Sequence, residues 1–168
     1  EDLGRGILIT GNHAPSVRIP RYGEPRISIP FTPKRPLVAG PALRAFNWAY
    51  YKAGARQVEP TIVHPNAFFF PLDAIGQWNR LYGAQGLYQH QCVLPFFTAP
   101  DALMEMLEIS QRAGHGSFLT VLKRFGDKPS PGLMSFPMPG YTLTLDFPNR
   151  GAPTVALLNE LDRITQQA

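Results

Sequence analysis

The chain has 168 residues, enough for one domain with its own hydrophobic core. Hydrophobic residues make up 44% and charged residues 17%, which excludes a disordered chain. The net charge of +4 comes without a run of Lys and Arg. The composition therefore argues against a nucleic-acid-binding protein but allows anionic ligands or contact with a membrane surface.

The cysteine count and the lack of targeting segments limit which disulfides and which cellular location we expect. Cys92 is the single cysteine, which excludes an internal disulfide, and we expect it to be a small buried residue on a strand. Without a signal peptide or a bilayer-spanning apolar run, we expect a cytoplasmic or membrane-associated protein rather than a secreted one. The first residue is Glu1 rather than Met, so we expect a piece of a longer protein.

The N-terminal half gives an uneven pattern. A short strand is predicted over Ile7–Thr10, and prolines exclude a long helix between Pro15 and Pro41. Residues 40–54 are predicted to form a helix with Leu43, Phe46 and Tyr50 on one stripe.

The next two segments are predicted from their composition. Residues 58–73 are apolar and expected to be extended. Asp73 is expected to cap a helix that ends near Gly83.

From Gly86 onward the pattern is regular. We predict strands over Leu87–Leu94, Phe118–Phe125 and Tyr141–Phe147, a helix over Pro100–Ala113, and a last amphipathic helix over 152–168. This β-α-β-β-α order is that of the ferredoxin-like split β-α-β-β-α-β unit, so the predicted fold class is α+β, with an antiparallel sheet and helices on one face. We also expect N-terminal segments to join this sheet as one continuous sheet, with one edge left without a partner.

One face of the predicted sheet is polar. Strand alternation places six side chains opposite the helices: Gln89, Gln91, Lys123, Phe125, Thr142 and Thr144. Two amides, two hydroxyls, one cation and one aromatic ring suit a polyhydroxyl or phosphorylated ligand. The alternative is an antiparallel sheet whose outer face is simply solvated.

The remaining polar residues give weaker signals. The histidines, His13, His64, His90 and His115, lack metal-ligand spacing, so we expect no metal site. His90 is expected to be a hydrogen-bonded packing residue on the helix side, and His115 a loop residue. The sequence contains no Gly-rich phosphate loop and no nucleophile elbow.

Five blocks in order carry a resemblance to one family. They read LGRGILITGNHA, RAFNWAYYKAG, FFFPLDAIGQWNRLYGAQGLYQHQCVLP, GSFLTVLKRFG and LMSFPMPGYTLTLDFPNRG. Over nearly its whole length the chain resembles the decaprenylphosphoryl-ribose oxidase branch of FAD-dependent oxidoreductases, in the vanillyl-alcohol-oxidase-type superfamily. The resemblance implies a role in cell wall arabinan biosynthesis.

The resemblance also implies a division of labour. Residues 1–168 would be the substrate-binding cap of a two-domain flavoenzyme, with its polar face towards the flavin, and the domain that binds most of the FAD would be absent. The full-length protein would oxidise a sugar secondary alcohol to a ketone, with hydride passing to the flavin. The cap alone would be inactive and would contain no catalytic residue.

Site residues follow from the same match. Gln89, Gln91, Lys123 and Phe125 match substrate-pocket positions, with Lys123 as the partner of an anionic group. Thr142 and Thr144 stand where the family typically carries Asn and Cys, and Phe70 corresponds to an aromatic pocket residue. A second pocket lysine of the family lies on a strand beyond Ala168.

The partners implied are a small-molecule or lipid-linked sugar phosphate and the chain's own FAD domain, with possible membrane-surface contact and no nucleic acid. The Pro-rich arm from Pro15 to Pro41 would be a lid or a membrane contact. The alternative function is a stand-alone glycan- or lipid-phosphate-binding module without catalysis.

Overall fold

The computed structural model describes residues 6–15, 20–23, 27–37, 40–56, 59–114, 117 and 120–168. The chain divides into two compact units, Glu1–Ala84 and Gln85–Ala168. We call them the N-terminal unit and the C-terminal unit.

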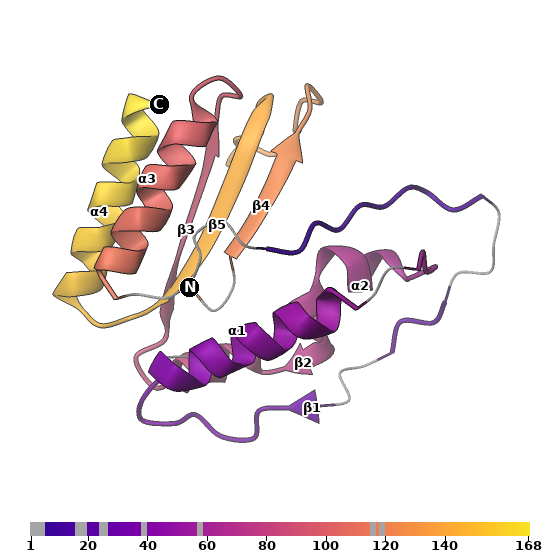
Figure 1. Cartoon of the computed structure of the whole chain (residues 1–168), viewed down its shortest axis with the longest axis horizontal. Coiled ribbons are helices and arrows are strands. Elements are labelled where there is room, and N and C mark those ends of the chain that lie inside the picture. Colours follow the sequence, from indigo (N-terminus) through magenta and orange to yellow (C-terminus); the bar gives the residue numbers. More distant parts are fainter. Residues whose placement is uncertain are drawn as a thin grey trace. The chain divides into compact units, whose positions relative to one another are not determined.

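The C-terminal unit is a three-stranded sheet with two helices on one face (Figure 1). Its elements are, in order, β3 (Leu87–Leu94), α3 (Ala99–Arg112), β4 (Thr120–Phe125), β5 (Gly140–Pro148) and α4 (Ala152–Gln167). β5 lies between β3 and β4 and is antiparallel to both. This arrangement confirms the predicted α+β class and the β-α-β-β-α order.

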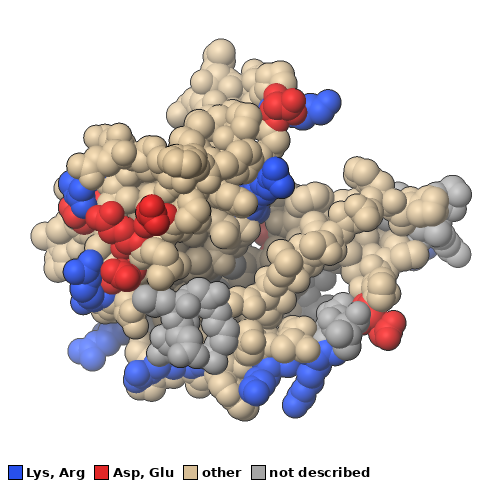
Figure 2. Space-filling model, turned by 45° about the horizontal axis from the view of Figure 1, so that its top comes forward, with Lys and Arg blue, Asp and Glu red and all other residues tan. Residues whose placement is uncertain are grey.

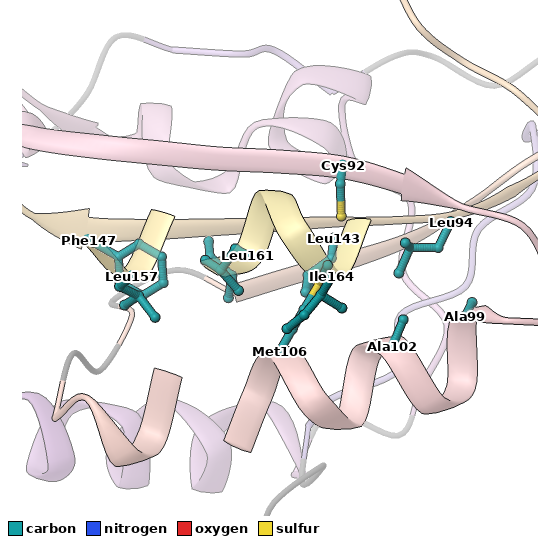
Figure 3. Packing of buried hydrophobic residues seen from close by; sticks show 11 residues of the cluster. Cys92, Leu94, Ala99, Ala102, Met106, Leu143, Phe147, Leu157, Leu161 and Ile164 are labelled. Carbon is teal, nitrogen blue, oxygen red and sulfur yellow. The ribbon is translucent and has the colours of Figure 1, made fainter. Parts of the chain in front are cut away.

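The hydrophobic core lies between this sheet and its helices. Figure 3 shows Cys92 and Leu94 of β3 and Leu143 and Phe147 of β5 directed towards α3 and α4. The helices contribute six buried side chains: Ala99, Ala102, Met106, Leu157, Leu161 and Ile164. The helices cover β3 and β5 rather than β4, whose Leu122 on the same face is 54% exposed.

Two local features hold the ends of these elements in place. An added Cβ at Gly140 would collide with the carbonyl of Leu94, so glycine is required where β5 begins beside the end of β3. Gly151 has a φ of 73°, and the buried Thr154 hydroxyl donates to the Pro148 carbonyl (3.1 Å) and accepts from the Arg150 amide (3.0 Å). These bonds set the turn from β5 into α4.

Charged side chains join the two helices on their outer side. The Arg163 guanidinium of α4 donates to Glu160 at 2.7 Å and to Glu105 of α3 at 3.0 Å. In Figure 2 acidic side chains gather on the left, with Lys and Arg beside them. Exposed pairs of this kind add about 0–1 kcal/mol each, so the apolar core supplies most of the packing energy.

The N-terminal unit consists of short elements and one long helix. Helix α1 (Gly40–Gly54) forms as predicted, and α2 (Pro65–Phe69) follows. Strands β1 (Ile27–Ser28) and β2 (Ile75–Gly76) pair in parallel. In the chain, β2 lies between the 3-10 helices Pro71–Ala74 and Trp78–Tyr82.

Several predictions for this unit are wrong. Residues 7–10 form no strand, and the segment 59–73, expected to be extended, contains α2. The helix expected after Asp73 is interrupted because Gln77 adopts a φ of 57°, although its last turn does end at Gly83.

The expectation of one continuous sheet is also wrong for the described residues. Their strands form two separate sheets, β1-β2 and β3-β5-β4. In the described parts of the chain, β3 and β4 each pair with β5 alone, so both outer edges of the larger sheet lack a strand partner there. No helix within the described ranges is long and apolar enough to cross a membrane.

The core assignment can be tested with two methionines of α3. Met106 is fully buried, whereas Met104 is 47% exposed. Met106→Ala should lower the free energy of unfolding of the C-terminal unit by about 2–5 kcal/mol, and Met104→Ala by about 0.5 kcal/mol or less. Trp48 and Trp78 both lie in the N-terminal unit, so urea unfolding should be followed by far-UV circular dichroism. Equal losses for the two variants would contradict the assignment.

Candidate functional site

The candidate site is the polar face, the side of the β3-β5-β4 sheet opposite α3 and α4. Because directly paired residues point to the same side, the register arranges its side chains in rows. The rows are Leu87–Pro148, then Gln89–Asp146, then Gln91–Thr144–Val121, then Val93–Thr142–Lys123, then Gly140–Phe125. The face therefore has an acidic row near one end and a cation near the other.

The acidic end is held by hydrogen bonds between side chains. The Gln89 amide nitrogen donates to the Asp146 carboxylate at 2.8 Å. One row along, the Gln91 amide nitrogen donates to the Thr142 hydroxyl at 3.3 Å. Asp146 and Thr142 are buried, whereas both glutamines are exposed. The buried partners thus fix one end of each exposed amide.

The other end of the face carries an uncompensated positive charge. The Lys123 side chain is exposed, and no carboxylate of the described residues forms an ion pair with it. Three partly buried apolar residues lie near it: Val93 in its own row, and Val121 and Phe125 in the rows on either side. This mixture of one cation with apolar neighbours can bind an anionic group attached to a less polar body.

The structure brings together six of the seven residues predicted for substrate binding. Gln89, Gln91, Lys123, Phe125, Thr142 and Thr144 share the polar face. Phe70 belongs to the N-terminal unit, where it ends α2 and is 56% exposed. Asp146 was not among the predicted site residues. The alternation that selected Thr142 and Thr144 extends one further step to it and was the available signal.

The helix side of β3 carries a separate pair. The buried His90 contacts the Asp162 carboxylate of α4 through Nε2 at 3.1 Å, which confirms its predicted packing role. Burial lowers the pKa of His90, and the attraction of Asp162 opposes that shift. Cys92 is buried as expected, and burial raises the pKa of its thiol. Neither side chain reaches the polar face.

Other parts of the described chain contain no comparable grouping of polar side chains that could bind a ligand. Within the described ranges no three His, Cys, Asp or Glu side chains are grouped so as to hold a metal ion. A hollow of about 490 Å³ beside α1 is lined by Trp48, Ala49, Lys52, Ala53 and Arg56. One helix and the turn after it supply all of these residues, so the hollow has a single wall. His115 lies outside the described residues.

Comparison with known proteins gives two informative similarities. The chain is 43% identical over 96 residues to decaprenylphosphoryl-beta-D-ribose oxidase from Mycolicibacterium smegmatis, a match that covers 57% of this chain and 20% of that protein. It is 28% identical over 176 residues to a Streptomyces coelicolor protein described as the uncharacterized protein in the mprA 5′ region, covering 95% of this chain and 46% of that protein. No family model matches the chain.

The first similarity relates the chain to part of an oxidoreductase. The chain spans about a fifth of the length of the oxidase and less than half of the second relative. The activity and substrate of a complete protein are therefore matters of proposal.

The His90 environment predicts a pH dependence of stability. Its folded-state pKa lies below the ordinary value of 6.5, so the unfolded chain takes up the proton more readily. The stability linked to neutral His90 is complete above pH 6.5 and is lost as the pH falls from there through the folded pKa. Between neutrality and about pH 5.5, wild type should lose unfolding free energy relative to His90→Gln, which does not titrate. A relative gain by wild type on acidification would contradict this sign.

Proposed function

We propose that the chain is the substrate-binding part of an FAD-linked oxidoreductase that acts on a polyprenylphosphoryl-ribose-like sugar. The reaction proposed for the complete protein is oxidation of a secondary alcohol of the sugar to a ketone, with FAD as hydride acceptor. One observation carries the proposal: the strand register gathers two amides, two hydroxyls and an uncompensated cation on one face. The identity with the mycobacterial oxidase supports the reaction class.

FAD itself does not fit the described residues. A dinucleotide needs a cradle of backbone N–H groups, usually at a helix start that follows a Gly-rich turn. Both long helices of the C-terminal unit instead have proline in their first turn, which removes one backbone donor there. We therefore assign the FAD to a domain outside this chain and derive no step through it.

The proposed substrate contacts divide by chemistry. Lys123 would bind the phosphate, because it is the one basic side chain among the paired rows of the polar face. Gln89, Gln91 and Thr144 would bind sugar hydroxyls, and Phe125 would pack against an apolar part of the ligand. The chain would thereby hold and orient the sugar while the chemistry depends on the cofactor.

A first test concerns flavin retention. Because the described residues offer no dinucleotide cradle, the purified 168-residue chain should be colourless and should lack flavin absorbance after gel filtration with added FAD. The same chain expressed with its flanking coding sequence should be yellow. Stoichiometric flavin on the 168-residue chain alone would contradict the assignment of FAD to another domain. A flanking sequence that encodes no flavin-binding protein would favour a stand-alone sugar-phosphate-binding module.

A second test concerns Lys123. Lys123→Ala should weaken binding of ribose 5-phosphate by roughly tenfold, since a hydrogen bond to a charged group contributes about 1.5–3 kcal/mol, less when exposed to solvent. Lys128→Ala is the matched control, because Lys128 is an exposed lysine in the connector after β4. NMR titration would measure both affinities, and circular dichroism should show unchanged melting. Equal affinities for the two variants would show that Lys123 is a solvated surface residue with no role in phosphate binding.

A further inference from the structure

The acidic end of the polar face contains a side chain whose position is unusual. Asp146 lies on the face opposite the helices, yet its exposed fraction is 0%. Burial of a carboxylate is costly unless hydrogen bonds compensate for the lost water. The Gln89 amide nitrogen supplies such a bond to the carboxylate at 2.8 Å. The main chain at this position is held separately, because the backbone N–H of Asp146 donates to the Ser117 hydroxyl at 3.0 Å.

The contact with Asp146 fixes which way the Gln89 amide points. A carboxylate accepts hydrogen bonds and donates none, so Gln89 must turn its NH2 group towards Asp146. The amide carbonyl oxygen, on the other branch of the planar group, is then directed away from the carboxylate. Gln89 is exposed, and no described residue donates to this oxygen. The oxygen is therefore available to a ligand as a hydrogen-bond acceptor.

The neighbouring row repeats the arrangement. Gln91 donates through its amide nitrogen to the buried Thr142 hydroxyl, which leaves its carbonyl oxygen on the outer branch. Each amide thus turns its carbonyl oxygen outward as an acceptor and keeps the second hydrogen of its NH2 group as a donor. A ligand hydroxyl can donate to the outward carbonyl oxygen and accept from the remaining N–H, whereas a phosphate group would be repelled by that oxygen and by the negative charge of Asp146 nearby.

The two ends of the face are too far apart for their charges to pair. Lys123 is level with Thr142, and Asp146 lies four residues further along β5, which is roughly 14 Å at the rise of an antiparallel strand. A phosphate and a set of hydroxyls would therefore settle at different ends.

We propose that Asp146 is a positioning residue that holds the Gln89 carbonyl oxygen outward, so that this end of the polar face recognises ligand hydroxyls and the phosphate lies at the Lys123 end. The assignment rests on the proposed sugar-phosphate function and adds the orientation of the ligand. It also makes Asp146 a determinant of specificity without requiring that it touch the substrate.

The orientation of Gln89 can be tested without a ligand. In wild type, the Gln89 side-chain amide protons should exchange with water more slowly than those of the exposed Gln85, measured by NMR. Asp146→Asn should remove this protection, because an Asn amide can donate as well as accept and no longer selects one orientation. Gln89 amide protons that exchange as fast as those of Gln85 in wild type would overturn the proposal.

The consequence for recognition is tested with ribose 5-phosphate and inorganic phosphate as probes. Asp146→Asn should weaken binding of ribose 5-phosphate about three- to tenfold, the usual effect of one hydrogen bond, and leave inorganic phosphate equal or tighter. Gln89→Met should act in the same way while keeping the carboxylate, and it serves if Asp146→Asn fails to fold. Asp127→Asn, in the exposed connector after β4, is the matched control.

The outcomes distinguish failure of the proposed sugar-phosphate function from failure of the positioning role of Asp146. Parallel loss of both ligands in both variants would show a purely structural role and overturn the assignment. If wild type bound neither ligand, the proposed function would fail and this assignment with it. Binding of ribose 5-phosphate by a chain whose Gln89 amide is unprotected would overturn the positioning role alone.

Discussion

The pairing of β5 on both of its edges is the constraint on which the C-terminal unit depends. β5 is hydrogen-bonded to β3 over eight residue pairs and to β4 over six, and β3 and β4 have no other strand partner in the described chain. A shift of β5 by one residue against both of its partners would exchange its two faces. Leu143 and Leu145 would then meet water, and Thr142 and Thr144 would meet the helices.

The apolar core selects the register, and the register in turn assembles the polar face. Leu143, Leu145 and Phe147 are at most 2% exposed, so the core strongly favours the observed pairing. The odd-numbered inward residues of β5 leave Thr142, Thr144 and Asp146 on the other side without any further requirement. The geometry of the candidate site is thus a by-product of core packing, which explains how so short a chain can hold it precisely.

The sequence predicts the C-terminal unit well because local pattern and tertiary packing agree there. Leu87–Leu94 is observed with the predicted bounds, and β5 and α4 lie within a residue or two of theirs. In the N-terminal unit the two signals conflict. Of its described hydrophobic residues, Leu43 and Tyr82 are buried, while Trp48, Phe69 and Phe70 are more than half exposed. With so little burial to confirm a periodic pattern, Ile7–Thr10 and the segment after Asp73 do not follow their propensities.

The sequence predicts which residues share the polar face, but not which way their side-chain amides point. Alternation alone identifies Gln89, Gln91 and Thr142 as neighbours, since it needs only the face of each strand. It cannot identify the donor at each amide, because that depends on pairing across strands: Gln89 is opposite Asp146, whereas Gln91 reaches Thr142 diagonally. Register is a tertiary property, so alternation places Asp146 on the polar face but does not show that it is the acceptor for the Gln89 amide.

The separation of Asp146 and Lys123 follows from that same register. For the two charges to meet, β4 would have to slide four residues along β5, which would remove Leu122 and Thr120 from their present partners. In the observed register, therefore, the cation and the carboxylate do not neutralise one another within the sheet. The two ends of the polar face therefore differ in charge, and the strand register sets which end is which. An unsymmetrical ligand, anionic at one end and rich in hydroxyls at the other, is the kind of molecule that such a face can distinguish from its reversed orientation.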